Sequence, residues 1–103
     1  MFSFIETATL SRLVQECMSD DEYSRLQQGL LANPNVGVVI PGSGGVRKMR
    51  WGKDGRGKRG GLRVIYLCRI ADYQIWMLTL YAKGAVGTIP AHVLKQIKDE
   101  IDG

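Results

Sequence analysis

The sequence predicts an α+β fold in the order β-α-α-β-β-β-α, in which two N-terminal helices and one C-terminal helix pack on a mostly antiparallel sheet. Three observations predict this fold. Apolar side chains recur three and four positions apart across residues 10–31 and again across residues 93–101, as on one face of a helix. Residues 46–81 contain runs of the β-branched and aromatic composition that is typical of strands. The 103 residues are enough for one hydrophobic core, so we expect a single domain over residues 1–103.

The first third of the chain predicts one strand and two helices. Residues 2–5 form a short apolar run that fits a strand, and residues 10–18 carry the apolar stripe of the first helix. Ser19 and Glu22 have the spacing of a capping box, in which each side chain accepts a hydrogen bond from a free backbone N–H. The second helix is expected to end at Asn33, because the residue before a proline is disfavoured in helical geometry. The short connection predicts an antiparallel pair of helices.

Residues 46–51 alternate between apolar and charged side chains, which is the period of a strand. Met49 and Trp51 are expected to point to one face of this strand, while Lys48 and Arg50 point to the other. The sequence therefore predicts a strand with one apolar face, suited to the core, and one cationic face.

Two central strands and a helix complete the expected fold. Residues 62–69 and 75–81 are almost continuously apolar, so we place them in the middle of the sheet beneath the helices. A turn is expected at residues 71–74. Pro90 predicts the start of the last helix, because proline is favoured at the first helical position.

The positive charge of the chain is concentrated in one band. Residues 41–70 carry nine cations and one acid, whereas residues 1–40 have a net charge of −3 and residues 71–103 of −1. A localised positive field suits a polyanion, of which nucleic acid is the usual example. Residues 42–63 also contain eight glycines, which favours close approach of the backbone to a ligand over a merely solvated loop. We expect residues 52–61 to form a mobile basic loop.

Several classes of protein do not fit the composition. No apolar run reaches the length of a membrane span, and the first residues lack the pattern of a signal peptide, so we expect a cytoplasmic, bacterial protein without a membrane partner. Cys17 and Cys68 are then expected to be reduced, half-buried core residues. Together with the distant His92, which we expect to be exposed on the last helix, they do not make a metal site. No cofactor is expected.

Three segments carry a resemblance to a known family. Residues 44–50 read GGVRKMR, residues 57–66 read GKRGGLRVIY and residues 78–83 read LTLYAK. This pattern resembles the RelE/ParE superfamily of toxins, and within it the HigB-like branch of the RelE toxins. The resemblance covers nearly the whole chain and implies a RelE-like fold. It also implies a type II toxin–antitoxin system, in which most RelE and HigB members cut mRNA on the translating ribosome.

The resemblance implies two sets of partners. One is a cognate antitoxin protein that binds the toxin and blocks it, and that carries a helix-turn-helix domain, so that any contact with DNA is indirect. The other is the ribosome, with ribosomal RNA and mRNA as the bound molecules.

Cleavage of RNA by its own 2′-hydroxyl requires removal of the 2′ proton, protonation of the leaving 5′ oxygen and stabilisation of the charge on the phosphate. Histidine or carboxylate usually moves these protons, but the basic band contains no histidine and only one acid, Asp54. Clustered cations offer a metal-independent route. Neighbouring positive charges lower the pKa of a lysine towards neutrality, and arginine clamps a phosphate through paired N–H bonds.

The resemblance assigns catalytic roles to five cations. Arg63 matches the arginine at the start of the family's third strand and is the expected main clamp on the transition state. Lys48 and Arg50 occupy the basic positions of the preceding strand, where relatives carry cations that act as a base or bind the phosphate. Lys83 matches a lysine at the end of the last strand, as a proton donor or a phosphate contact. Lys58, in the glycine-rich loop, is expected to close over the scissile phosphate or to grip ribosomal RNA.

Contacts with RNA and the ribosome are expected from four further cations and one tyrosine, namely Arg47, Lys53, Arg56, Arg59 and Tyr81. Structural alternatives remain open for several of these assignments. Lys48 and Arg50 also fit a solvated strand face, Arg63 fits a plain surface residue, and Lys83 fits a cation in a turn. Tyr66 and Tyr81 also fit the hydrophobic core.

One departure from the family pattern keeps alternative functions open. Some RelE relatives follow the last strand with a basic run and a catalytic tyrosine, whereas here Lys83 is followed by the sequence GAVGT. The leading prediction is a ribosome-dependent mRNA endoribonuclease held inactive by its antitoxin. The alternatives are a ParE-like poison of DNA gyrase without catalysis of its own, and a plain nucleic-acid-binding module.

Overall fold

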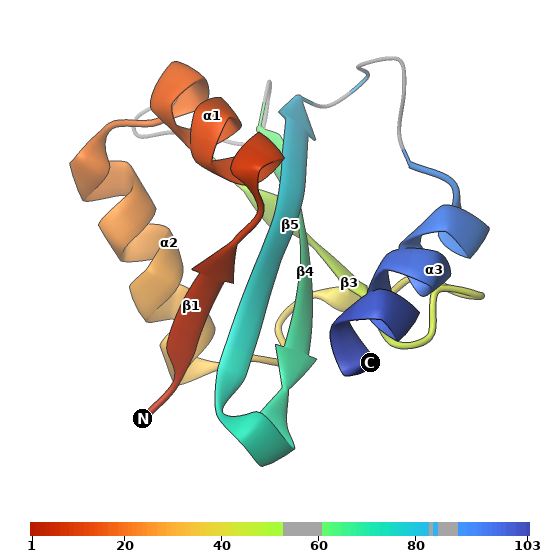
Figure 1. Ribbon diagram of the computed structural model, residues 1–103. Helices are drawn as coiled ribbons and strands as arrows, with labels where there is room; N and C mark the ends of the chain where they lie inside the picture. Colours follow the sequence, from red (N-terminus) through yellow and green to blue (C-terminus); the bar gives the residue numbers. More distant parts are fainter. Residues whose placement is uncertain (53–60, 83, 85–88) are drawn as a thin grey trace.

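The computed structural model of the chain describes residues 1–52, 61–82, 84 and 89–103. In these residues a five-stranded sheet is combined with three α-helices, which confirms the predicted α+β class (Figure 1). The elements in chain order are β1 (Ser3–Glu6), α1 (Ala8–Cys17), α2 (Asp20–Ala32), β2 (Val38–Val39), β3 (Arg47–Trp51), β4 (Leu62–Arg69), the 3₁₀ helix η1 (Ile70–Asp72), β5 (Gln74–Ala82) and α3 (Ala91–Asp102).

The sheet has the strand order β1-β5-β4-β3-β2, with β4 at its centre. The first strand runs parallel to β5, and the other neighbouring strands are antiparallel, so the sheet is mostly antiparallel as predicted. The predicted order lacked one element, because β2 has only two residues. Val38 and Val39 are both exposed, and they pair with Lys48 and Arg47 of β3 at the edge of the sheet. So short a strand has no alternating pattern to detect in the sequence.

Side-chain caps define both N-terminal helices. Thr7 accepts a hydrogen bond from the backbone N–H of Leu10 at the start of α1, at 3.0 Å. The capping box predicted at the start of α2 is present in full, with Ser19 and Glu22 each accepting a backbone hydrogen bond. The last helix differs by one position from the prediction, because Pro90 is its N-cap in an extended conformation and the helix begins at the next residue.

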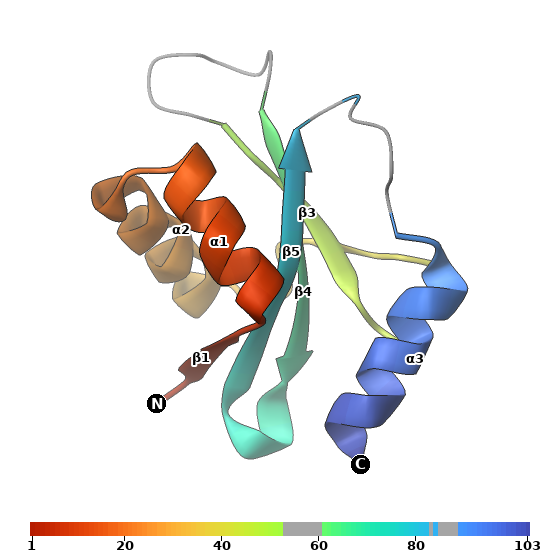
Figure 2. The ribbon, with the colours of Figure 1, turned by 45° about the horizontal axis from the view of Figure 1, so that its top comes forward.

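Helices cover both faces of the sheet. Figures 1 and 2 show α1 and α2 on one side and α3 on the other. The core beneath α1 and α2 includes Leu26, Val64 and Tyr66, whereas the core beneath α3 is built around Ile65 and Leu94. Successive residues of β4 therefore enter different cores, and this explains why the strand is apolar almost throughout.

The expectations for the two cysteines and for His92 also hold. Cys17 and Cys68 are free and half-buried. His92 is exposed on α3. In the part of the chain that the structure describes, no helix has the length and apolar character needed to cross a membrane.

Candidate functional site

The alternation of β3 separates its cations into two groups. Met49 and Trp51 pack against the core beneath α1 and α2, so Lys48 and Arg50 lie on the face that α3 partly covers. Both cations are exposed. The predicted strand with one apolar and one cationic face is confirmed.

Two cross-strand rows form the cationic part of this face. In the first row, Arg50 of β3 lies directly opposite Arg63 of β4, which in turn lies opposite Tyr81 of β5. In the second row, Lys48 lies opposite Ile65. The rows are two residues apart along the strands, which corresponds to about 7 Å. Like charges placed directly opposite each other on neighbouring strands are destabilising, so the first row favours an anion beside it.

Arg63 is the most confined cation of the first row. Its neighbours along β4, Leu62 and Val64, are buried, and its own side chain is half-buried. Its Nη1 atom is buried and has no hydrogen-bond partner among the described residues. A buried donor left without a partner costs about 1–3 kcal/mol, and more when the group is charged. An anion whose binding uncovers Nη1 and that accepts a hydrogen bond from it would remove that cost.

Several other cations of the described residues form ion pairs with carboxylates, in contrast to this row. Within the described ranges no carboxylate forms an ion pair with Arg50 or Arg63. Arg69, at the far end of β4, pairs with Asp72 at 2.9 Å and with Asp102 at 3.3 Å. Arg50 and Arg63 therefore place two positive charges opposite each other without a carboxylate counter-ion among the described residues.

Arg47 lies on the opposite face of the sheet from the two rows. Its Nη1 atom donates to the carbonyl oxygen of Gly37 at 2.6 Å and to that of Asn35 at 3.3 Å. The Tyr66 hydroxyl reinforces this attachment, since it accepts from the N–H of Gly37 and donates to the carbonyl of Pro34. Burial raises the pKa of Tyr66, which keeps the hydroxyl protonated as a donor. Arg47 therefore lies apart from Lys48, Arg50, Arg63 and Tyr81, the other predicted site residues that the structure describes, and its hydrogen bonds attach the segment before β2 to the sheet.

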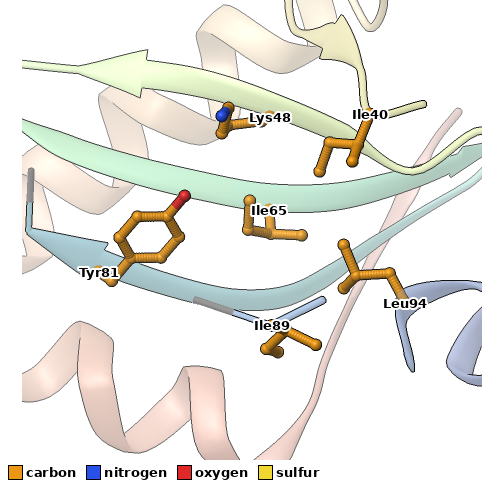
Figure 3. A pocket seen from close by; sticks show the side chains of 6 residues that line it. All are labelled: Ile40, Lys48, Ile65, Tyr81, Ile89 and Leu94. Carbon is orange, nitrogen blue, oxygen red and sulfur yellow. The ribbon is translucent and has the colours of Figure 1, made fainter. Parts of the chain in front are cut away.

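A cavity of about 150 Å³ lies beside the two rows, between the sheet and α3 (Figure 3). Lys48 and Tyr81 lie at one end of it, and Figure 3 shows the ring of Tyr81 turned from β5 towards β4. The rest of the lining is aliphatic. The six lining residues are Ile40, Lys48, Ile65, Tyr81, Ile89 and Leu94.

The turn before β3 fixes one wall of this cavity. Ser43 is fully buried, and its hydroxyl donates to the carbonyl oxygen of Ile40 at 2.6 Å and accepts from the N–H of Val46 at 3.0 Å. Gly42 and Gly44 adopt positive φ angles of 78° and 79°, which side-chain-bearing residues rarely do. This part of the glycine-rich segment therefore serves the fold, because it holds Ile40 in place over the sheet.

Ion pairs fix the opposite wall, α3. Leu94 is buried in the core between helix and sheet, and Arg69 of β4 pairs with Asp102 near the end of the helix. Asp102 also pairs with Lys98 at 2.7 Å. The hydrogen bond between them raises the pKa of Lys98 and lowers the pKa of Asp102, so both remain charged at neutral pH.

Sequence reasoning found the cations of this face but not the cavity. Ile40, Ile89 and Leu94 come from a turn, a connection and a helix that are far apart in the sequence, and an isolated isoleucine or leucine carries no sign of a shared cavity. The predicted site residues Lys53, Arg56, Lys58, Arg59 and Lys83 lie outside the described residues, as does most of the predicted loop at 52–61. Their assigned roles stay predictions.

No metal-binding cluster is present among the described residues, where no three His, Cys, Asp or Glu side chains lie close enough to hold an ion. A comparison of the chain with known protein families finds no match. The observations that bear on function are therefore the cationic rows and the cavity described above, together with the resemblance of residues 44–50, 57–66 and 78–83 to the RelE/ParE toxins.

Proposed function

We propose that this protein is the toxin of a type II toxin–antitoxin system and that it cleaves mRNA on the ribosome, in the manner of the RelE and HigB toxins that its sequence resembles. Two observations support this proposal, the sequence resemblance and the cationic face of the sheet. The resemblance supplies the reaction and the partners, and the cationic face supplies a place where an anionic substrate fits. The proposal locates the protein in the bacterial cytoplasm.

One observation supports this proposal above the others, namely the direct opposition of Arg50 and Arg63 with a buried, unpartnered Nη1 atom on Arg63. A phosphodiester between the two guanidinium groups accepts hydrogen bonds from both and removes their mutual repulsion. The interaction strengthens as the phosphate gains charge in the transition state, which is the condition for catalysis rather than mere binding.

The proposed reaction is transesterification within the RNA chain. The 2′ oxygen loses its proton and attacks the phosphorus atom, which forms a 2′,3′-cyclic phosphate and releases the 5′ oxygen, and that oxygen takes up a proton. Arg63 stabilises the phosphate, with Arg50 beside it. Lys48, Lys58 and Lys83 are the candidates for moving the two protons, and the proposal requires no metal ion.

The ribosome and the antitoxin complete the proposal. A domain of 11.4 kDa offers little surface for selecting mRNA, so ribosomal RNA would position the message while cations of the basic band bind both molecules. A cognate antitoxin, by analogy with the family one that carries a helix-turn-helix domain, would inhibit the toxin by covering this face.

Primer extension on mRNA from induced cells tests the proposal. We expect new 5′ ends within translated messages when the wild-type protein is produced, and their loss with Arg63→Ala. Arg12→Ala is the matched control, because Arg12 is exposed on α1 and forms only a surface ion pair with Glu16. Both variants should show the circular dichroism spectrum of the wild type.

Three results would contradict the proposal. Undiminished cleavage by Arg63→Ala would exclude the arginine clamp. Breaks in DNA that precede any loss of translation would favour a gyrase poison. Equal cleavage of free and translated mRNA by the purified protein would exclude the dependence on the ribosome.

A further inference from the structure

The end of the cavity that Lys48 and Tyr81 line, its polar end, lies next to the proposed phosphate site. Tyr81 is the cross-strand partner of Arg63, and Lys48 lies two residues from Arg50 on β3. Two residues of strand correspond to about 7 Å. A nucleotide whose phosphate lies between the two arginines therefore has the cavity immediately beside it.

The lining of the cavity restricts its occupant. Ile65 and Leu94 are buried beneath it, and the half-buried Ile40 and Ile89 add further aliphatic surface. With a volume of about 150 Å³, the cavity has room for one small group with apolar faces. In single-stranded RNA an unstacked base is such a group, whereas a paired base within a double helix cannot leave the stack without cost.

The polar end adds hydrogen-bonding groups to an otherwise aliphatic cavity. Lys48 has an ammonium group, which only donates hydrogen bonds, and the hydroxyl of Tyr81 donates one and accepts others. A carbonyl oxygen on the base accepts hydrogen bonds from these side chains. Uracil and cytosine both carry such an oxygen next to the ribose, so the polar end favours a base over a purely apolar group without distinguishing these two pyrimidines.

We infer that the cavity between the sheet and α3 binds one unpaired RNA base that carries a carbonyl oxygen, beside the phosphate bound by Arg50 and Arg63. The inference rests on the proposed function and extends it to a base-binding subsite. An apolar side chain of a protein partner also fits the aliphatic part of the cavity, but it would leave the donors of Lys48 and Tyr81 without acceptors. The base uses both parts.

Fluorescence anisotropy with short labelled RNA oligomers tests this inference. The 2′-fluoro forms of oligo(U) and of an abasic oligomer of equal length lack the attacking hydroxyl, so binding is measured without cleavage. We expect oligo(U) to bind about tenfold more tightly than the abasic oligomer at about 50 mM salt.

Variants separate base binding from phosphate binding. Tyr81→Phe and Lys48→Met should each reduce the preference for oligo(U) over the abasic oligomer several-fold, and Ile89→Trp, which fills the cavity, should abolish it. Binding of the abasic oligomer should remain in Tyr81→Phe and Ile89→Trp. Lys95→Met is the control, because Lys95 is exposed on α3 and forms a surface ion pair with Asp99. Thermal denaturation confirms that each variant is folded.

The possible failures are distinguishable. Equal, Arg63-dependent binding of oligo(U) and the abasic oligomer would overturn the inference and leave the phosphate site intact. Absence of binding to every oligomer would overturn both the inference and the proposed phosphate site. If Ile89→Trp leaves RNA binding unchanged but prevents neutralisation by the antitoxin, the cavity belongs to the protein partner and the inference is wrong.

Discussion

At the scale of single residues, the site is defined by what its arginines lack. Arg69 has two carboxylate partners and Arg47 has two carbonyl partners, so the guanidinium groups of both make contacts that stabilise the fold. Arg50 and Arg63 face each other without such partners among the described residues. An arrangement that weakens the free protein is expected where binding of a ligand relieves it.

Arg63→Met should therefore stabilise the protein when no anion is present. The substitution removes the repulsion of Arg50 and the unpartnered Nη1 atom while keeping an apolar stem of similar length. We expect a gain of about 1 kcal/mol, which raises the melting temperature of a domain of this size by about 4–8 °C. Inorganic phosphate should stabilise the wild type more than the variant. Arg12→Met serves as the control and should show neither effect, and a loss of stability in Arg63→Met would contradict the prediction.

At the scale of elements, regular periodicity was sufficient to predict most of the fold. The helical stripes, the capping box of Ser19 and Glu22, and the two apolar strands all appear within a few residues of their predicted positions. The alternation that assigns Lys48 to one face of β3 also assigns Arg47 to the other face, so its separation from the site follows from the same pattern. The two-residue β2 and the cavity were not predictable, because both arise from contacts between segments distant in sequence.

The attachment of the segment before β2 makes a separate prediction. In Tyr66→Phe the buried N–H of Gly37 and the carbonyl of Pro34 lose their partner, and the ring stays in the core. We expect a loss of about 1–3 kcal/mol in the free energy of unfolding, measured by urea denaturation. Tyr73→Phe is the matched control, because Tyr73 is exposed and should show little change. Equal stabilities of the two variants would show that the Tyr66 hydroxyl does not fasten this segment.

At the scale of the whole molecule, the distribution of charge distinguishes a binding face from a generally basic protein. The net charge is only +4, but residues 41–70 contribute +8 while the segments on either side are negative. Nucleic acid bound through a localised face releases counterions for each phosphate contacted, so affinity falls with salt in proportion to the contacts and not to the net charge.

The salt dependence of RNA binding therefore distinguishes direct phosphate contacts by Arg50 and Arg63 from a general attraction to the net positive charge of the protein. For a single-stranded RNA, each phosphate contact contributes about 0.7 to the slope of log affinity against log salt, so Arg50→Gln with Arg63→Gln should lower the slope by about 1.4. Arg12→Gln with Lys95→Gln removes the same charge from exposed helix positions outside the two rows and should leave the slope unchanged. Anisotropy titrations with a labelled oligomer over a range of salt concentrations measure both. If the salt slope falls equally in the two double variants, RNA responds to the net charge of the protein. Arg50 and Arg63 would then not be specific phosphate contacts.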